Sequence, residues 1–99
     1  MKVSIRRGGG FAGISEEIAA LDTTSLNQAA ASEVENVVRG VNFFDLPANP
    51  PGQRVGADFL KYEITITDGG RQHTITFNDD NAPATARLRE FVERVAKVR

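Results

Sequence analysis

Three glycines near the amino terminus have the spacing of a nucleotide-binding loop. Gly8, Gly10 and Gly13 match G-x-G-x-x-G and follow a short alternating segment. A dinucleotide site also needs a helix directly after this loop, a parallel second strand and an acidic residue about 20 positions further on. Asp22 comes too early, and no strand–helix–strand pattern follows. We therefore interpret the glycines as a hairpin loop and expect no cofactor.

The other side chains with catalytic or metal-binding potential are isolated in the sequence. His73 is the only histidine and there is no cysteine, so a zinc site on it would need three further ligands without any thiolate. No serine has a G-x-S-x-G context. We interpret Glu16-Glu17 as a solvated edge, Asp79-Asp80 as a helix-start cap and His73 as packed at the sheet edge. The sequence therefore predicts no enzyme, no catalytic residue and no metal site.

The composition is that of a folded globular protein with little net charge. The 99 residues are 40% apolar and 25% charged, which suits a single core. The 12 basic and 13 acidic residues give a net charge of -1, without the positive excess that binding to nucleic acid needs. No apolar run approaches the roughly 20 residues of a membrane-spanning helix, and no signal peptide is evident. We expect one domain over residues 1–99, in the cytoplasm, with no nucleic-acid or membrane partner.

Hydrophobic periodicity predicts the elements that must position these residues. Strict alternation predicts strands over residues 2–6, 59–67 and 72–78, the last two joined by the turn signal Asp68-Gly69-Gly70-Arg71. An apolar stripe at helical spacing predicts a helix from Leu26 to Val41. A second helix is predicted after Pro83, and its stripe consists of Leu88, Phe91, Val92 and Val95.

The stretch after the glycine loop, residues 14–22, fits two periods. Ile14, Ile18 and Leu21 lie at helical spacing, and local propensity favours a helix. The preceding glycines instead favour a hairpin, in which one strand face would consist of Ile14, Glu16, Ile18 and Ala20. With a strand here the order is ββαββα, which is an α+β fold with a four-stranded antiparallel sheet and two helices packed on one face.

Two loops are candidates for binding a partner. In the first, Phe11 lies among glycines, where a rigid aromatic side chain suits an interface hot spot but is equally consistent with packing onto the core. The second, residues 48–56, is expected to be an exposed loop, polar and proline-stiffened, and it is either a recognition loop or a plain connector. The predicted partner-binding residues are Gly9, Gly10, Phe11, Ala12, Ile14, Pro50 and Pro51.

An ordered set of short motifs covers nearly the whole chain. Residues 7–14 read R-G-G-G-F-A-G-I, residues 43–47 read F-F-D-L-P, and residues 68–74 read D-G-G-R-Q-H-T. In this combination the chain resembles the emfourin family, whose namesake is the proteinaceous inhibitor of protealysin, a thermolysin-like zinc metalloprotease. The resemblance implies a bacterial protein that binds such a protease and closes its active-site cleft. It also favours the strand over residues 14–22.

Two modes of inhibition are open to a protein of this kind. A carboxylate, an imidazole or a terminal amine could ligate the zinc of the protease, or an apolar side chain could fill its hydrophobic S1′ pocket. Because there is no cysteine and His73 is interpreted as structural, we favour occlusion, with Phe11 and Ile14 as anchors. We expect the free inhibitor to be a monomer. The alternative is a non-enzymatic binding or regulatory domain with no protease target.

Overall fold

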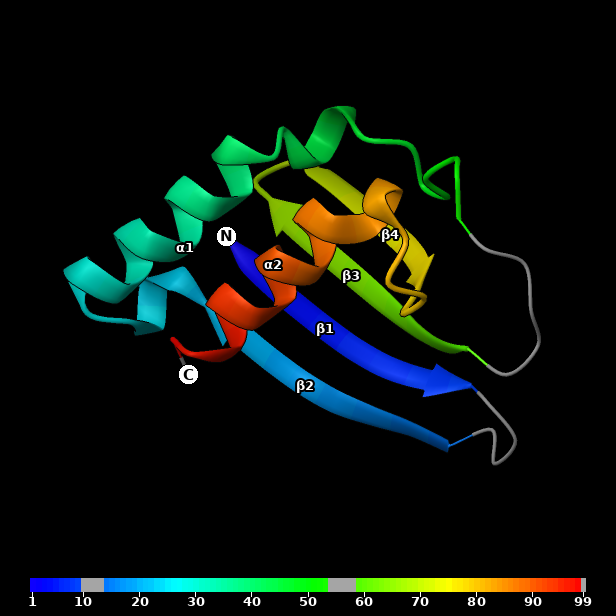
Figure 1. The fold of residues 1–99 in the computed structure, drawn as a ribbon. Coiled ribbons are helices and arrows are strands. Elements are labelled where there is room, and N and C mark those ends of the chain that lie inside the picture. The colour runs from blue at the N-terminus through cyan, green and yellow to red at the C-terminus, as the bar shows by residue number, and fades with distance from the viewer. Residues whose placement is uncertain (10–13, 54–58, 99) are drawn as a thin grey trace.

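The computed structural model describes residues 1–9, 14–53 and 59–98 and has the expected ββαββα order (Figure 1). The four strands are β1 (Lys2–Gly9), β2 (Ile14–Asp22), β3 (Leu60–Asp68) and β4 (Arg71–Asn78). The two helices are α1 (Gln28–Gly40) and α2 (Ala86–Ala96). Three short 3-10 turns accompany them: η1 (Thr23–Ser25), η2 (Phe43–Asp45) and η3 (Pro83–Thr85).

The strands form one antiparallel sheet in the order β2-β1-β3-β4. The central strand β1 pairs with β2 on one side and with β3 on the other, and Val3 lies opposite both Leu21 and Ile66. Both helices cover one face of this sheet (Figure 1). The expected α+β architecture is therefore confirmed.

The strand alternative for residues 14–22 is correct, but its predicted face is not. The register of β1 against β2 shifts between Ile5 and Arg6, as in a β-bulge, so that Ile5 lies opposite Ala19 and Arg6 lies opposite Glu17. Ala19 is fully buried whereas Ala20 is exposed. The bulge shifts the alternation by one residue, so a simple period of two places Ala20 on the wrong side.

The core lies between the covered sheet face and the two helices. Hydrophobic periodicity predicted most of the core residues, because strand alternation and helical stripes both reflect burial on one side. The buried apolar residues are Val3, Ile5, Ala19, Ile64, Ile66, Ile75 and Phe77 from the sheet, Val34, Val37, Val38, Leu88, Phe91, Val92 and Val95 from the helices, and Phe43 from η2.

Helix α1 begins two residues later than the apolar stripe predicted, at Gln28. Asn27 is its N-cap: the side-chain oxygen of Asn27 accepts a hydrogen bond of 2.8 Å from the backbone N–H of Ala30. This bond satisfies one of the unpaired N–H groups at the helix start. Leu26 therefore precedes the helix and packs against the core from outside it.

Replacing Asn27 with alanine is expected to lower the free energy of unfolding by about 1 kcal/mol, because alanine leaves that N–H without its side-chain acceptor. Urea unfolding followed by circular dichroism measures the change. Asn36→Ala is the matched control, since Asn36 is exposed in the middle of α1 and its loss should change stability by no more than about 0.5 kcal/mol. Equal losses in the two variants would contradict the capping role.

Candidate protein-binding site

One end of the sheet brings together two connections that are far apart in the sequence. Strand β1 ends at Gly9, which lies opposite both Ile14, the first residue of β2, and Leu60, the first residue of β3. The end of β1 and the starts of β2 and β3 therefore lie side by side (Figure 1). Gly9 has a φ of +91°, a left-handed conformation that a residue with a Cβ adopts only with strain. We call the region of Gly9, Ile14 and Leu60 the sheet end.

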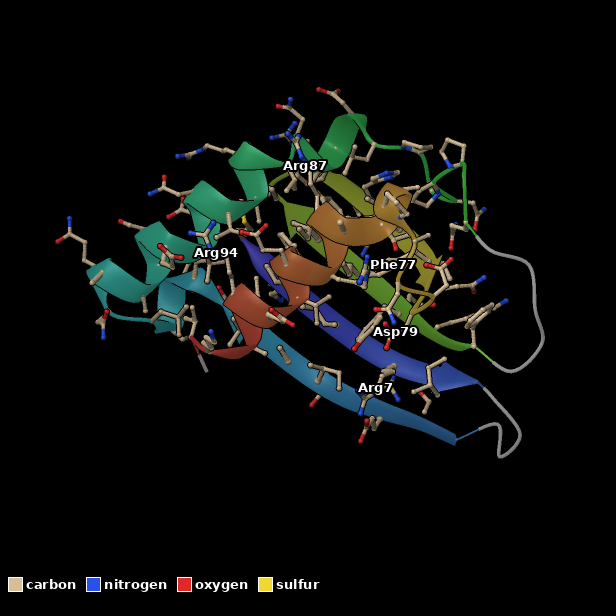
Figure 2. All side chains as sticks on the ribbon, viewed as in Figure 1. Arg7, Phe77, Asp79, Arg87 and Arg94 are labelled. Atoms are coloured by element: carbon tan, nitrogen blue, oxygen red, sulfur yellow. The ribbon has the colours of Figure 1, made fainter. Side chains whose placement is uncertain are left out.

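A stack of three side chains lies next to the sheet end. The rings of Tyr62 and Phe77 are stacked with their centroids 5.3 Å apart, and the guanidinium carbon of Arg7 is 6.0 Å from the centre of the Tyr62 ring. Figure 2 labels Arg7 and Phe77 on their strands. Arg7 also forms an ion pair with Glu16 on β2. Hydrogen bonding to Glu16 and then to Tyr62 raises the pKa of Arg7, so the guanidinium stays charged.

One apolar side chain at the sheet end is exposed to solvent. Leu60 is 39% exposed, and it is the only large hydrophobic residue of the described part of the chain that is exposed to this degree. Strict alternation over residues 59–67 places Leu60 on the same face as Ile64 and Ile66, which are both buried. The alternation was right, but the strands continue past α2 at this end, so the helix does not cover Leu60 (Figure 1).

The structure divides the predicted partner-binding residues between two places. Gly9 and Ile14 lie at the sheet end. Gly10, Phe11 and Ala12 fall outside the described residues. Pro50 and Pro51 lie elsewhere, in a groove beside the start of α2. Pro50 is buried and Pro51 is exposed.

The described part of the second loop, residues 48–53, is not a free-standing connector. Its backbone runs along the outer edge of β4, where the Ala48 carbonyl accepts a hydrogen bond of 2.8 Å from the Thr76 N–H. The Gln53 side chain accepts from the Asn78 N–H at 2.6 Å and donates to the Pro50 carbonyl at 2.7 Å. The expectation of a wholly exposed loop is therefore wrong for Pro50, because the loop satisfies backbone groups of an edge strand.

The other chemical candidates have structural roles. His73 lies on the edge strand β4, its Nε2 is 2.6 Å from the Leu46 carbonyl oxygen, and its ring packs edge-on against Phe43 at 5.6 Å. Asp80 is buried, and its Oδ1 accepts hydrogen bonds from the Ala82 N–H and the Thr85 hydroxyl at the start of η3. Both match the interpretations from the sequence.

Metal-ligand and membrane features are absent from the part of the chain that the structure describes. Residues 1–9, 14–53 and 59–98 contain no cluster of three or more histidine, cysteine, aspartate or glutamate residues that could hold a metal ion. Neither described helix is long and apolar enough to cross a bilayer.

The chain is a small α+β domain, and at its sheet end three paired strand ends and the exposed side chain of Leu60 lie together. The Emfourin family model matches residues 5–96, and the chain belongs to the emfourin family. The suspected resemblance is thereby confirmed, and the family is one of protease inhibitors. No curated protein and no solved structure matches the chain.

Proposed function

We propose that this chain inhibits a thermolysin-like zinc metalloprotease by binding it stoichiometrically and occluding its active-site cleft. Membership of the emfourin family supports protease inhibition in general. The observation that carries the proposal is the double pairing of Gly9 with Ile14 and Leu60, which brings two connections to one end of a braced sheet. The paired ends of three strands give a fixed surface, which suits binding to another protein.

Two possible zinc ligands of the chain already have partners within it, which favours occlusion over ligation of the protease zinc. His73 is engaged with the Leu46 carbonyl and the Phe43 ring, and Glu16 is paired with Arg7. The exposed side chain at this end, Leu60, is apolar. We assign the contact to Gly9, Gly10, Phe11, Ala12 and Ile14. Pro50 and Pro51, in the groove beside the start of α2, form a second part of the proposed contact. The inhibitor is proposed to act as a monomer in the bacterial cytoplasm and to use no cofactor.

The test is a titration of thermolysin, and of any thermolysin-like protease encoded next to this gene, with the purified chain. We expect peptidase activity to fall linearly with added chain and to reach its minimum at about one inhibitor per enzyme, because tight binding consumes both partners in equal numbers. Added zinc should not restore activity, since the cleft is covered and the metal is still in place.

Trypsin is the control enzyme, because its cleft contains no zinc and has a different shape, and its activity should not change. A lack of inhibition of every thermolysin-like enzyme at micromolar chain would contradict the proposed target. The alternative of a binding domain without a protease target would then account for the fold.

A further inference from the structure

A groove beside the start of α2 lies apart from Gly9 and Ile14 at the sheet end. Of the residues proposed to contact the protease, Pro50 and Pro51 line it. It has a volume of about 430 Å³ and lies between the segment after η2 and the segment formed by η3 and the first turns of α2. All four prolines of the chain line this groove, namely Pro47, Pro50, Pro51 and Pro83. Ala84 and Leu88 line it as well. We call it the proline groove.

The walls of the proline groove are fixed before any ligand arrives. Each proline has a locked φ and no backbone N–H, so these walls are stiff and offer few donors. The loop that carries Pro50 is held to β4 by the Ala48–Thr76 hydrogen bond and by the bond from the Asn78 N–H to the Gln53 side chain. The same side chain also donates to the Pro50 carbonyl within the loop. A preformed groove loses little conformational entropy on binding, which favours affinity.

One charged residue lines this apolar groove. Arg87 is exposed, and it makes no hydrogen bond or ion pair with any residue that the structure describes. Every other described arginine has such a partner; these residues are Arg6, Arg7, Arg39, Arg71, Arg89 and Arg94. Arg87 also lies in the first turn of α2, where a cation opposes the helix dipole. Its position is therefore not explained by the stability of the helix.

A second hollow continues past Arg87. This hollow of about 210 Å³ lies between α1 and α2, and it shares Val41 and Arg87 with the proline groove. Figure 2 shows Arg87 near the start of α2, beside the end of α1. A ligand that occupies both hollows would have the middle of its chain beside the Arg87 guanidinium. Its carboxylate would then belong to a side chain within a segment, because a terminal carboxylate would end the ligand at Arg87.

We propose that the proline groove binds a peptide segment of a partner protein in which one acidic side chain is flanked by apolar side chains. The apolar side chains fill the proline-lined hollow, and the carboxylate accepts hydrogen bonds from Arg87, whose planar fork matches carboxylate geometry. This proposal does not depend on protease inhibition, because its test uses the free chain and no protease.

The test uses the free ¹⁵N-labelled chain and the blocked peptide Ac-SLLELS-NH₂. Amide signals of Val41, Leu46, Ala84, Arg87 and Leu88 should shift on titration, while those of β1 and β2 should not. Arg87→Gln should weaken binding about fivefold, the loss of one partly exposed ion pair. Arg39→Gln is the matched control, because Arg39 is an exposed arginine that lines neither hollow, and it should bind like the parent.

Two further arms separate the charge from the apolar contact. The peptide Ac-SLLQLS-NH₂ should bind the parent about fivefold more weakly than Ac-SLLELS-NH₂ does. The two peptides should bind Arg87→Gln with equal affinity. Ala84→Glu places a carboxylate three residues before Arg87 and inside the groove, so it should abolish the shifts while leaving the melting temperature near that of the parent. No shifts with the parent, or unchanged binding by both Arg87→Gln and Ala84→Glu, would overturn the proposal.

Discussion

Replacing Phe43 with alanine is expected to lower the free energy of unfolding by about 3–5 kcal/mol. The Phe43 ring is 1% exposed, although it lies on a single turn of 3-10 helix. It stacks on Phe91 of α2 at 5.9 Å and meets His73 of β4 edge-on at 5.6 Å. One side chain therefore joins a helix to the edge of the sheet. Domains of this size have about 5–15 kcal/mol of stability in total, so the variant loses a large part of it.

The neighbouring phenylalanine is the control for this variant. Phe44 is half-buried, with its ring 5.8 Å from Phe43 and the Arg71 guanidinium 4.0 Å from its centre. Phe44→Ala should cost about 1–2 kcal/mol, because less of its surface is removed from water. Urea unfolding of the three proteins measures both losses. Similar losses for the two variants would contradict the central position assigned to Phe43.

Replacing Phe11 with alanine is expected to weaken inhibition of the target protease about 30- to 700-fold. This range corresponds to about 2–4 kcal/mol, which is typical of an aromatic hot spot that fills a pocket. The motivation is the aromatic residue among glycines, in the connection between Gly9 and Ile14 at the sheet end. The inhibition constant of the purified variant against the protease measures the effect.

Phe44→Ala again supplies the control, because Phe44 lies near Met1 and Asp68 at the opposite end of the sheet. It is the same substitution, and it should inhibit like the parent at a temperature where both variants are folded. If Phe11→Ala inhibits as well as the parent, the anchor assignment is wrong. Ile14→Ala would then test the second predicted anchor.

Local sequence patterns identified the elements that bury one face along most of their length. They failed where the secondary structure depends on pairing with another strand. The alternation from Leu60 to Ile66 was enough to identify β3, because one face meets the helices along most of its length. Residues 14–22 also fit a helix, since Ile18, the extra residue of the bulge, and Leu21 are both partly buried at helical spacing. Only the pairing with β1 separates these alternatives, and a local window does not contain that partner.

Some residues of the candidate sites could also be recognised from the sequence, and others could not. The glycine run and Ile14 were recognisable from composition, because glycines mark a turn and an aromatic among them is unusual. The proline groove was not recognisable, since its walls come from residues 41–51 and 83–88, which are roughly 30 positions or more apart in the chain. The exposure of Leu60 was also hidden, because it depends on where α2 stops covering the sheet.

The two outer strands of the sheet differ in how they discourage addition of another strand. Along β4, outward-facing N–H groups such as that of Thr76 are already bonded to the loop beside it. Strand β2 has no such cover within the described residues, but it is bulged and carries the exposed carboxylates of Glu16 and Glu17. Bulges and charges on an edge disfavour growth of a sheet into fibrils. A concentrated solution of this chain is thus protected against polymerisation at both edges, by a covering loop on one and by shape and charge on the other.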